Sequence, residues 1–207
     1  MQILLSDTGK RFNHDWIFRK VSYQFSSGMS YAITGPNGSG KSTLLQVIAG
    51  SIGLSEGSVT YHQNKPIDPD KVFRYISIAT PYQELIEEMT LLEFLHFHEK
   101  FKPLIEGIRI DEIIRIIGLE NASNKQLRYY SSGMKQRVKL AQAIFSDTPC
   151  LLLDEPCTNF DEEGIALYQR LIADYCTKRM VIVSSNEKQE YTFCNEVIDI
   201  TKYKRPV

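Results

Sequence analysis

The segment that most constrains this chain is glycine-rich and occupies residues 35–43. It reads GPNGSGKST, a full match to the pattern GxxxxGK[ST], and it stands between a predicted strand at 31–33 and a predicted helix at 43–49. That order of strand, loop and helix is the setting in which this pattern binds phosphate. Chance would produce the bare pattern in roughly one per cent of chains of this length, so a plain glycine-rich turn is a poor explanation.

Each part of this phosphate loop has a physical role in holding a triphosphate. The glycines let the backbone curl until successive N–H groups face the phosphates, and the helix that follows adds partial positive charge at its N-terminus. Lys41 would reach the β- and γ-phosphates, and Ser42 would offer its hydroxyl to Mg²⁺. The loop therefore predicts ATP binding by Gly35, Pro36, Asn37, Gly38, Ser39, Gly40, Lys41, Ser42 and Thr43.

Four short apolar runs predict the central sheet. They lie at 31–33, 75–79, 150–153 and 180–183, and each ends in a turn or in polar residues. Runs that are apolar throughout are typical of parallel strands, because such strands are buried on both faces. We therefore expect an α/β fold with a mostly parallel sheet.

Helical patterns fill much of the chain between these runs. One helix begins at Thr90, where Glu93 completes a capping box, and continues until Pro103 blocks it. Another repeats isoleucine at helical spacing over 110–117 and ends at Gly118. These patterns predict one domain over 1–207, with a core at about 1–80 and 146–207 and a mostly helical inserted subdomain at about 84–145.

Two carboxylates follow the apolar run at 150–153. They are Asp154 and Glu155. Packing alone does not explain two charged residues at the end of a buried strand. In an α/β sheet that end of a strand faces the ligand crevice, so Asp154 is expected to hold Mg²⁺ through water and Glu155 to deprotonate the attacking water. Charged residues often close a strand, but together with the phosphate loop this pair is a strong indication of nucleotide hydrolysis.

Taken together, these motifs resemble the nucleotide-binding domain of an ABC (ATP-binding cassette) ATPase over nearly the whole chain. The family signature, usually LSGGQ, is matched loosely by YSSGM at 130–134, shortly before the Asp-Glu strand. The resemblance implies a P-loop NTPase (RecA-like) core with N-terminal antiparallel strands. It also implies that Ser131 and Gly133 meet an ATP bound by a second cassette, identical or paralogous, and that Asp161 communicates across the same interface.

Phe12 matches the aromatic residue with which this family stacks on adenine. Trp16 competes for that role. The plain alternative for Phe12 is a strand aromatic that packs in the core.

The sequence departs from the family pattern at three places. Asn186 stands where the family has a switch histidine, and an amide can donate a hydrogen bond but cannot carry charge or transfer a proton. This substitution predicts intact ATP binding with slow hydrolysis. Ser132 and Met134 replace a glycine and a glutamine of the signature, and a side chain at 132 narrows the allowed backbone angles.

The third departure concerns the Q-loop, the segment that carries a magnesium-binding glutamine in this family. Strict alignment with the strand at 75–79 puts Thr80 or Pro81 at that position. Gln83 is the best candidate for contact with Mg²⁺ and water, because a loop can absorb a short shift.

Composition narrows the possible partners. The chain has 24 Lys+Arg against 25 Asp+Glu, a formal net charge of -1, which argues against a nucleic-acid partner. Its apolar runs are far shorter than the roughly 18 residues that a membrane-spanning helix needs, and its N-terminus lacks the pattern of a secretory signal. We expect a cytoplasmic protein whose four cysteines, Cys150, Cys157, Cys176 and Cys194, are reduced packing residues.

The resemblance implies the ATP-binding subunit of a transporter, peripheral on the cytoplasmic face of the membrane and paired with a separate membrane-spanning permease subunit. In extent the chain is similar to compact exporter ATPases such as the haem-exporter subunit of cytochrome c maturation. One alternative is a soluble, non-transport ABC ATPase, although the chain has neither the coiled coil of DNA-repair members nor the second cassette of translation factors. The other is a slow ATP-sensing regulatory subunit, which Asn186 favours.

Overall fold

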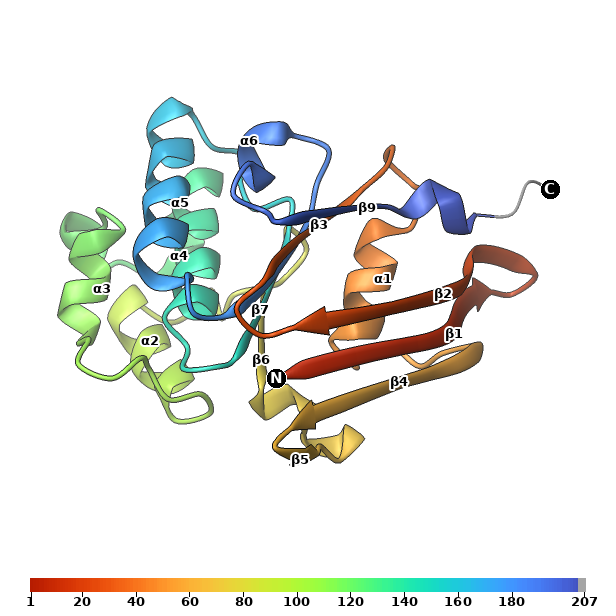
Figure 1. Ribbon diagram of the computed structural model, residues 1–207. Coiled ribbons are helices and arrows are strands. Elements are labelled where there is room, and N and C mark those ends of the chain that lie inside the picture. The colour runs from red at the N-terminus through yellow and green to blue at the C-terminus, as the bar shows by residue number, and fades with distance from the viewer. Residues whose placement is uncertain (205–207) are drawn as a thin grey trace.

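The computed structural model describes residues 1–204 and contains two sheets with helices packed around them (Figure 1). The larger sheet is parallel throughout, with strand order β6-β7-β8-β3-β9. All four predicted runs form strands in it, which confirms the α/β class and the P-loop NTPase core. The strands are β3 (Ser30–Thr34), β6 (Ile76–Ala79), β7 (Cys150–Asp154), β8 (Met180–Ser184) and β9 (Glu196–Asp199).

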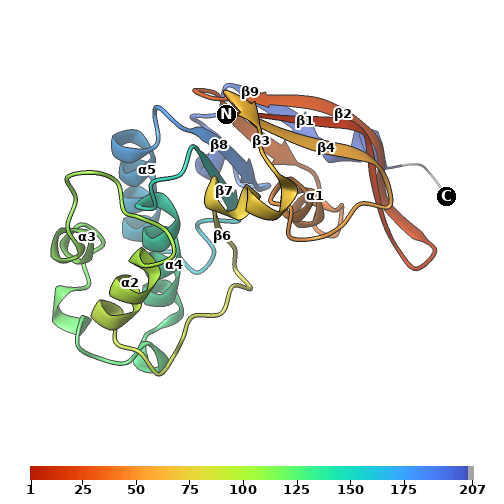
Figure 2. The same cartoon turned by 90° about the horizontal axis from the view of Figure 1, so that it is seen from below.

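The smaller sheet is antiparallel and has strand order β2-β1-β4-β5. Figures 1 and 2 both show it at the end of the molecule away from α2 and α3. It confirms the expected N-terminal antiparallel strands. Its strands are β1 (Gln2–Phe12), β2 (Asp15–Ser26), β4 (Glu56–Gln63) and β5 (Lys65–Pro66).

The helices begin and end close to their sequence signals. Thr90 and Glu93 form the predicted capping box, in which Thr90 Oγ1 accepts from the Glu93 N–H at 3.2 Å and Glu93 Oε2 accepts from the Thr90 N–H at 2.8 Å. Helix α1 begins at Lys41 rather than Thr43, because the phosphate loop closes directly onto its first turn. The helices are α1 (Lys41–Ile48), α2 (Leu91–Glu99), α3 (Ile110–Ile116), α4 (Ser132–Ile144), α5 (Glu162–Tyr175) and α6 (Lys188–Tyr191).

Helices α2, α3 and α4 lie in the chain between β6 and β7, as the helical pattern predicted. The segments between them are loops with short 3₁₀ turns, so residues 84–145 hold less helix than expected. Their apolar side chains join one continuous cluster with α5 and one face of the parallel sheet.

Strand β7 shows how the two faces of the parallel sheet are covered. Leu151 and Leu153 pack in the cluster with α4 and α5, whereas Cys150 and Leu152 pack in the cluster with α1 and the antiparallel sheet. This alternation follows from the two-residue period of a strand. A strand buried on both faces is apolar along its whole length, which is the pattern seen in the sequence.

Two further expectations concern membrane spans and cysteines. Among residues 1–204, no helix combines the length and the apolar character needed to cross a bilayer. The four cysteines are free thiols, and Cys150, Cys157 and Cys176 are buried. Their burial agrees with the predicted packing role.

Candidate functional site

Three loops meet at the carboxyl edge of the parallel sheet. The phosphate loop follows β3, the Asp154-Glu155 pair ends β7, and Asn186 follows β8. Because β8 lies between β7 and β3 in the sheet, the loop after β8 lies between the other two. The topology therefore brings together residues that are far apart in the sequence, at the edge where α/β proteins bind ligands.

The phosphate loop needs glycine at defined positions. Gly35, Gly38 and Gly40 have φ of 144°, 74° and 103°, a region that side chains with a Cβ rarely adopt. A Cβ at Gly35 would lie 2.9 Å from both Ile200 and Ser39, and one at Gly40 would collide with Ile17. Both the backbone angles and the close packing explain the glycines of the motif.

Lys41 is already placed over the loop. Its Nζ donates to the carbonyl oxygen of Gly35 at 2.8 Å and lies 3.4 Å from that of Pro36, and the residue is 4% exposed. Gly40 precedes α1 and offers no side-chain cap, so the first N–H groups of that helix keep their capacity to bind an anion. The ammonium group of Lys41 and the N-terminus of α1 are together suited to binding a phosphate.

Asp154 has a buried oxygen that no described residue satisfies. The side chain is 3% exposed, and its Oδ1 has no hydrogen-bond partner within residues 1–204. A buried carboxylate oxygen without a partner is costly, so the position fits a site that Mg²⁺ and its water ligands would complete.

A cavity of about 320 Å³ joins these groups. Lys41, Ser42 and Thr43 of the phosphate loop and helix α1 line it together with Asp154 and Glu155. The structure thus brings together the predicted phosphate-binding and hydrolytic residues. The full lining is Ile17, Asn37, Gly38, Gly40, Lys41, Ser42, Thr43, Pro81, Tyr82, Asp154 and Glu155.

The backbone of Glu155 is held in an uncommon conformation. Its φ is 43°, its N–H donates to the carbonyl of Ser184 at 2.9 Å, and its own carbonyl accepts from Thr158 N–H at 3.1 Å and Thr158 Oγ1 at 2.9 Å. A positive φ at a glutamate persists only where surrounding contacts fix it, and such residues cluster at functional sites.

Asn186 touches the phosphate loop directly. Its Oδ1 accepts from the Gly35 N–H at 3.2 Å, and its Nδ2 donates to Asn37 Oδ1 at 3.1 Å. A second cavity of about 240 Å³ is lined by Asn186, Asn37 and Glu155 among others. Asn186 therefore contacts the phosphate loop and shares a cavity with Glu155.

The signature residues form a separate cavity of about 480 Å³. Ser131, Gly133 and Asp161 all line it, although they come from different segments of the chain. Ser131 is the N-cap of α4 and accepts from Met134 N–H at 3.3 Å, and Asp161 is the N-cap of α5 and accepts from Gly164 N–H at 2.8 Å. The substituted residues Ser132 and Met134 line the same cavity.

Gln83 is not among the described residues that line the phosphate cavity. Within the described chain, Pro81 and Tyr82 reach the phosphate cavity, while Gln83 lines a neighbouring cavity of about 560 Å³ beside α4. Gln83 Oε1 is buried there and has no partner among the described residues.

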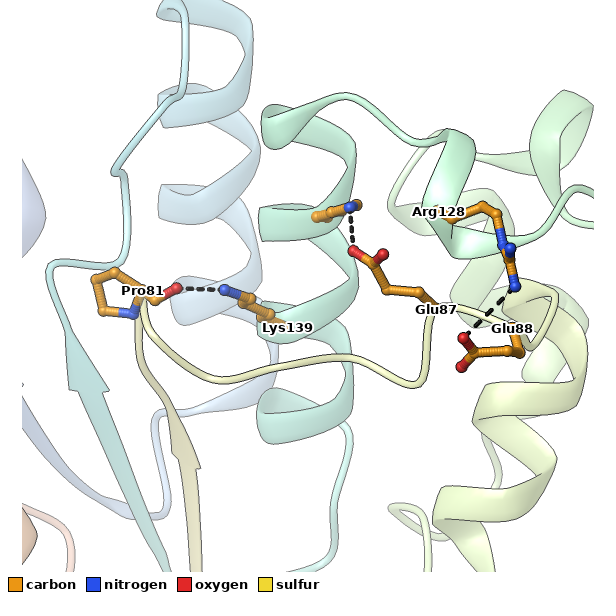
Figure 3. A network of polar contacts seen from close by, with 6 residues as sticks. Pro81, Glu87, Glu88, Arg128 and Lys139 are labelled. Carbon is orange, nitrogen blue, oxygen red and sulfur yellow. Dashed lines mark hydrogen bonds and ion pairs between the residues drawn. The ribbon is translucent and has the colours of Figure 1, made fainter.

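Ionic and polar contacts join residues 81–88, the segment around Gln83, to its neighbours (Figure 3). Lys139 of α4 donates to the carbonyl of Pro81, and Lys135 of the same helix pairs with Glu87. Lys135 lowers the pKa of Glu87. Arg128 lies 3.5 Å from Glu88. The loop after β6 is thus connected to the helix that carries the signature.

Phe12 is not a core residue. Its ring is 51% exposed at the β1–β2 hairpin, with Lys10 Nζ at 5.0 Å from its centroid. Trp16 is half-buried, and the Arg19 guanidinium lies 4.1 Å from its ring centroid. A cation lies over each of the two rings, and Phe12 is the more exposed residue, so its ring is the more accessible for stacking on a base.

Two residues of the phosphate cavity were missed from the sequence. Ile17 packs against Gly40, and the strand alternation that buries Phe18 puts Ile17 on the cavity side. Tyr82 is 89% exposed and lies at the rim of the cavity. Tyr82 could have been noticed in the sequence, because it is an aromatic residue that follows Pro81 shortly after strand β6. No sequence signal singles out Ile17.

The known proteins that this chain resembles include ABC transporter ATP-binding proteins. Residues 18–158 match the family described as "ABC transporter". The chain is 33% identical to the uncharacterized ABC transporter ATP-binding protein YybJ of Bacillus subtilis, over 87% of this chain and 84% of that protein. It is 29% identical to the cytochrome c biogenesis ATP-binding export protein CcmA of Agrobacterium fabrum, over 91% of this chain and 90% of the relative.

Solved structures show the same fold. A putative ABC transporter ATP-binding protein from Pyrococcus furiosus superposes with a TM-score of 0.81 at 22% identity, covering 99% of this chain and 100% of that one. The dimeric post-hydrolysis structure of the ATP-binding cassette MJ0796 bound to ADP and Pi gives a TM-score of 0.80 at 24% identity, covering 96% and 94%.

Proposed function

This chain belongs to the ABC transporter family of ATP-binding proteins, and from that premise we propose that it binds and hydrolyses ATP to drive a separate membrane subunit. In this proposal ATP closes a dimer of two cassettes, and hydrolysis opens it again. The observation that carries the proposal is the shared cavity that Lys41, Ser42, Asp154 and Glu155 all line.

The residues of that cavity divide the chemistry among them. The loop N–H groups, the α1 terminus and Lys41 bind and orient the phosphates, and this electrostatic positioning is the main source of catalysis in phosphoryl transfer. Glu155 orients the attacking water and takes its proton. Ser42 and the unsatisfied Asp154 Oδ1 would hold Mg²⁺, which supplies charge neutralisation on the phosphates when bound.

A second cassette would complete the site. Ser131, Gly133 and Asp161 lie in a different cavity from Lys41, so they would act on the ATP of a partner chain. Ser131 and the N-terminus of α4 offer a hydroxyl and helix N–H groups to a γ-phosphate. The dimeric state of MJ0796 supports this arrangement by its similarity in fold.

The neighbouring cavity beside α4 is the proposed contact for the membrane subunit. Its lining includes Glu84, Glu87 and Glu88, with Tyr82 exposed at one end. Lys135 and Lys139 connect this loop to α4, so a displacement of the loop would reach the signature residues. The proposal places the chain at the cytoplasmic face of the membrane, and the name of the relative CcmA, an ATP-binding export protein, supports a role in transport.

A second candidate is a slow ATP-sensing subunit, which Asn186 favours. Its amide meets the phosphate loop but is neutral at every pH, so it cannot take up a proton during turnover. In that case ATP would still close the dimer, and hydrolysis would be rare. Steady-state ATPase rates with and without a partner captured from detergent-solubilised membranes separate the two candidates, because a partner-stimulated rate identifies a transport motor.

Glu155→Gln tests the main proposal. The amide cannot accept the proton from water, so ATP should accumulate in a closed dimer that elutes at twice the monomer mass on gel filtration. Glu162→Gln is the matched control, because Glu162 lies in the exposed first turn of α5 outside the phosphate cavity. A Glu155→Gln protein that stays monomeric at saturating ATP and magnesium would contradict the sandwich dimer.

A further inference from the structure

The loop that directly follows Glu155 is held by two buried side chains from other parts of the fold. Gln136 Nε2 donates to the carbonyl of Pro156 at 2.8 Å, and Glu190 Oε1 accepts from the Cys157 N–H at 2.7 Å. Gln136 and Glu190 are each 3% exposed. Buried polar contacts of this kind fix a backbone position, since breaking one leaves a buried group without a partner.

Gln136 reaches this loop from the signature helix. It lies on α4, whose N-cap Ser131 belongs to the signature segment. A glutamine is rarely buried on the core-facing side of a helix unless it is hydrogen-bonded. Here the side-chain amide of Gln136 donates to the carbonyl of Pro156 in the loop after Glu155. The signature helix and the loop after Glu155 are therefore joined by a direct contact.

Glu190 reaches the same loop from the segment that follows Asn186. It lies on α6, and the hydroxyl of Tyr168 in α5 donates to its backbone carbonyl at 2.7 Å, which fixes the position of α6. Glu190 also lines the cavity that contains Glu155 and Asn186. Burial raises the pKa of Glu190, and its Oε2 has no partner among residues 1–204.

We propose that Gln136 and Glu190 are positioning residues that hold the loop after Glu155 and thereby keep this general base in its reactive orientation. The positive φ of Glu155 makes external support necessary, because the backbone would otherwise relax to a commoner conformation. Gln136 also carries any movement of the signature helix to the base. A partner chain that binds through Ser131 would thus act on the hydrolytic residue of this chain through a single helix.

The inference rests on the proposed ATPase function, and single-turnover hydrolysis by the full chain tests it. Gln136→Met should lower the rate of Mg-ATP hydrolysis about tenfold or more while leaving the Kd for ATP within twofold, because a small misplacement of a catalytic group has effects of this size. Gln142→Met is the matched control. Gln142 is also buried on α4, but its side-chain Nε2 makes no hydrogen bond to the loop or to any other described residue, so its variant should keep the wild-type rate.

Glu190 provides a rescue experiment. Glu190→Met should slow hydrolysis as Gln136→Met does, whereas Glu190→Gln should restore the rate, because the glutamine keeps an oxygen that can accept from Cys157 N–H. Gln136→Glu replaces the donor with an acceptor of the same shape. It should also lower the rate, and it serves as the second test of position 136 if the methionine variant does not fold.

The outcomes distinguish a failure of the positioning role from a failure of the proposed ATPase function. Hydrolysis at the wild-type rate in Gln136→Glu, or a Glu190→Gln protein as slow as Glu190→Met, would overturn the positioning role and leave the ATPase function intact. A wild-type chain that binds ATP but shows no single-turnover hydrolysis would overturn the proposed hydrolytic function, and with it the positioning of a general base.

Discussion

Asn186 and Asn37 are joined by a hydrogen bond between their side-chain amides, with Nδ2 of Asn186 donating to Oδ1 of Asn37 at 3.1 Å. Asn186 follows β8, and Asn37 lies in the phosphate loop, so this contact ties the end of one strand to the loop after its neighbour. The bond is made by an amide at the position where the resemblance predicts a switch histidine. It keeps the connection to the loop without a group that can gain charge near neutral pH.

Asn186→His should therefore increase the rate of hydrolysis by about tenfold, a modest part of the range for general acid–base assistance. The imidazole would reach the same loop and could also take up and release a proton. Phosphate release at saturating Mg-ATP measures the effect. Lys188→His, on the exposed neighbouring helix α6, controls for an added histidine. An unchanged or lower rate in Asn186→His would show that Asn186 does not limit turnover.

Lys41→Ala should weaken ATP binding about tenfold to about hundredfold, since hydrogen bonds to charged groups contribute roughly 1.5–3 kcal/mol. Its ammonium group lies over the loop carbonyls, where it can turn to the β- and γ-phosphates. Isothermal titration calorimetry measures the Kd. Lys65→Ala, on the exposed strand β5, removes the same charge away from the cavity and should bind ATP normally. Equal affinities in the two variants would remove Lys41 from the phosphate site.

Phe12→Ala should weaken ATP binding by about twofold to about tenfold, the range expected from the loss of one aromatic stacking contact. Phe12 is 51% exposed, and Lys10 lies over one face of its ring, so a base would stack on the other face. Phe73→Ala is a control of equal size, since Phe73 is 56% exposed on the 3₁₀ helix Pro69–Arg74. If Trp16→Ala weakens binding more than Phe12→Ala does, the adenine lies on Trp16.

The sequence predicted those parts of the site whose geometry is local. The phosphate loop is one continuous segment, and its glycines, Lys41 and the following helix fix one another's positions within a few residues. The positions of Asp154 and Glu155 were equally predictable, because the carboxyl ends of parallel strands lie at the same edge of the sheet. Strand β9 had no such signal, because half of its four residues are acidic.

The parts that the sequence could not give depend on contacts between distant segments. Gln83 was placed by its distance from a strand, but the path of the loop after β6 is set by Lys139 and Lys135 of α4. The contacts of Gln136 and Glu190 with the loop after Glu155 likewise join residues from separate elements. No local pattern marks a buried glutamine or glutamate as a partner for a particular backbone group.

Thr90→Ala should lower the free energy of unfolding by about 1 kcal/mol, the usual effect of losing an N-cap. Thr90 and Glu93 form reciprocal bonds at the start of α2, and these bonds lower the pKa of Glu93. Urea unfolding measures the change. Arg109→Ala is the control, because Arg109 is the N-cap of α3 but makes no capping bond through its side chain. An equal loss in both variants would show that the capping box adds nothing to stability.

Glu190→Gln should gain stability relative to wild type as the pH rises. The folded pKa of Glu190 is raised by burial and by the nearby Glu155 carboxylate, so the folded state binds this proton more tightly than the unfolded chain does. The stability that the proton confers is full below the unfolded pKa of about 4.3 and is lost as the pH rises through the folded pKa. Glutamine has no proton to lose, so the variant escapes that loss.

Urea unfolding of both proteins at about pH 5 and about pH 8 measures this effect as the difference between the two free energies. The groups that face Glu190 are Glu155, Cys157 and Tyr168, and burial raises the pKa of both the Cys157 thiol and the Tyr168 phenol. These two therefore stay neutral across the range, and Glu155 is common to both proteins. The difference in favour of Glu190→Gln should be larger at the higher pH. A difference that is constant, or larger at the lower pH, would show that the Glu190 carboxyl does not take up its proton more readily in the folded state.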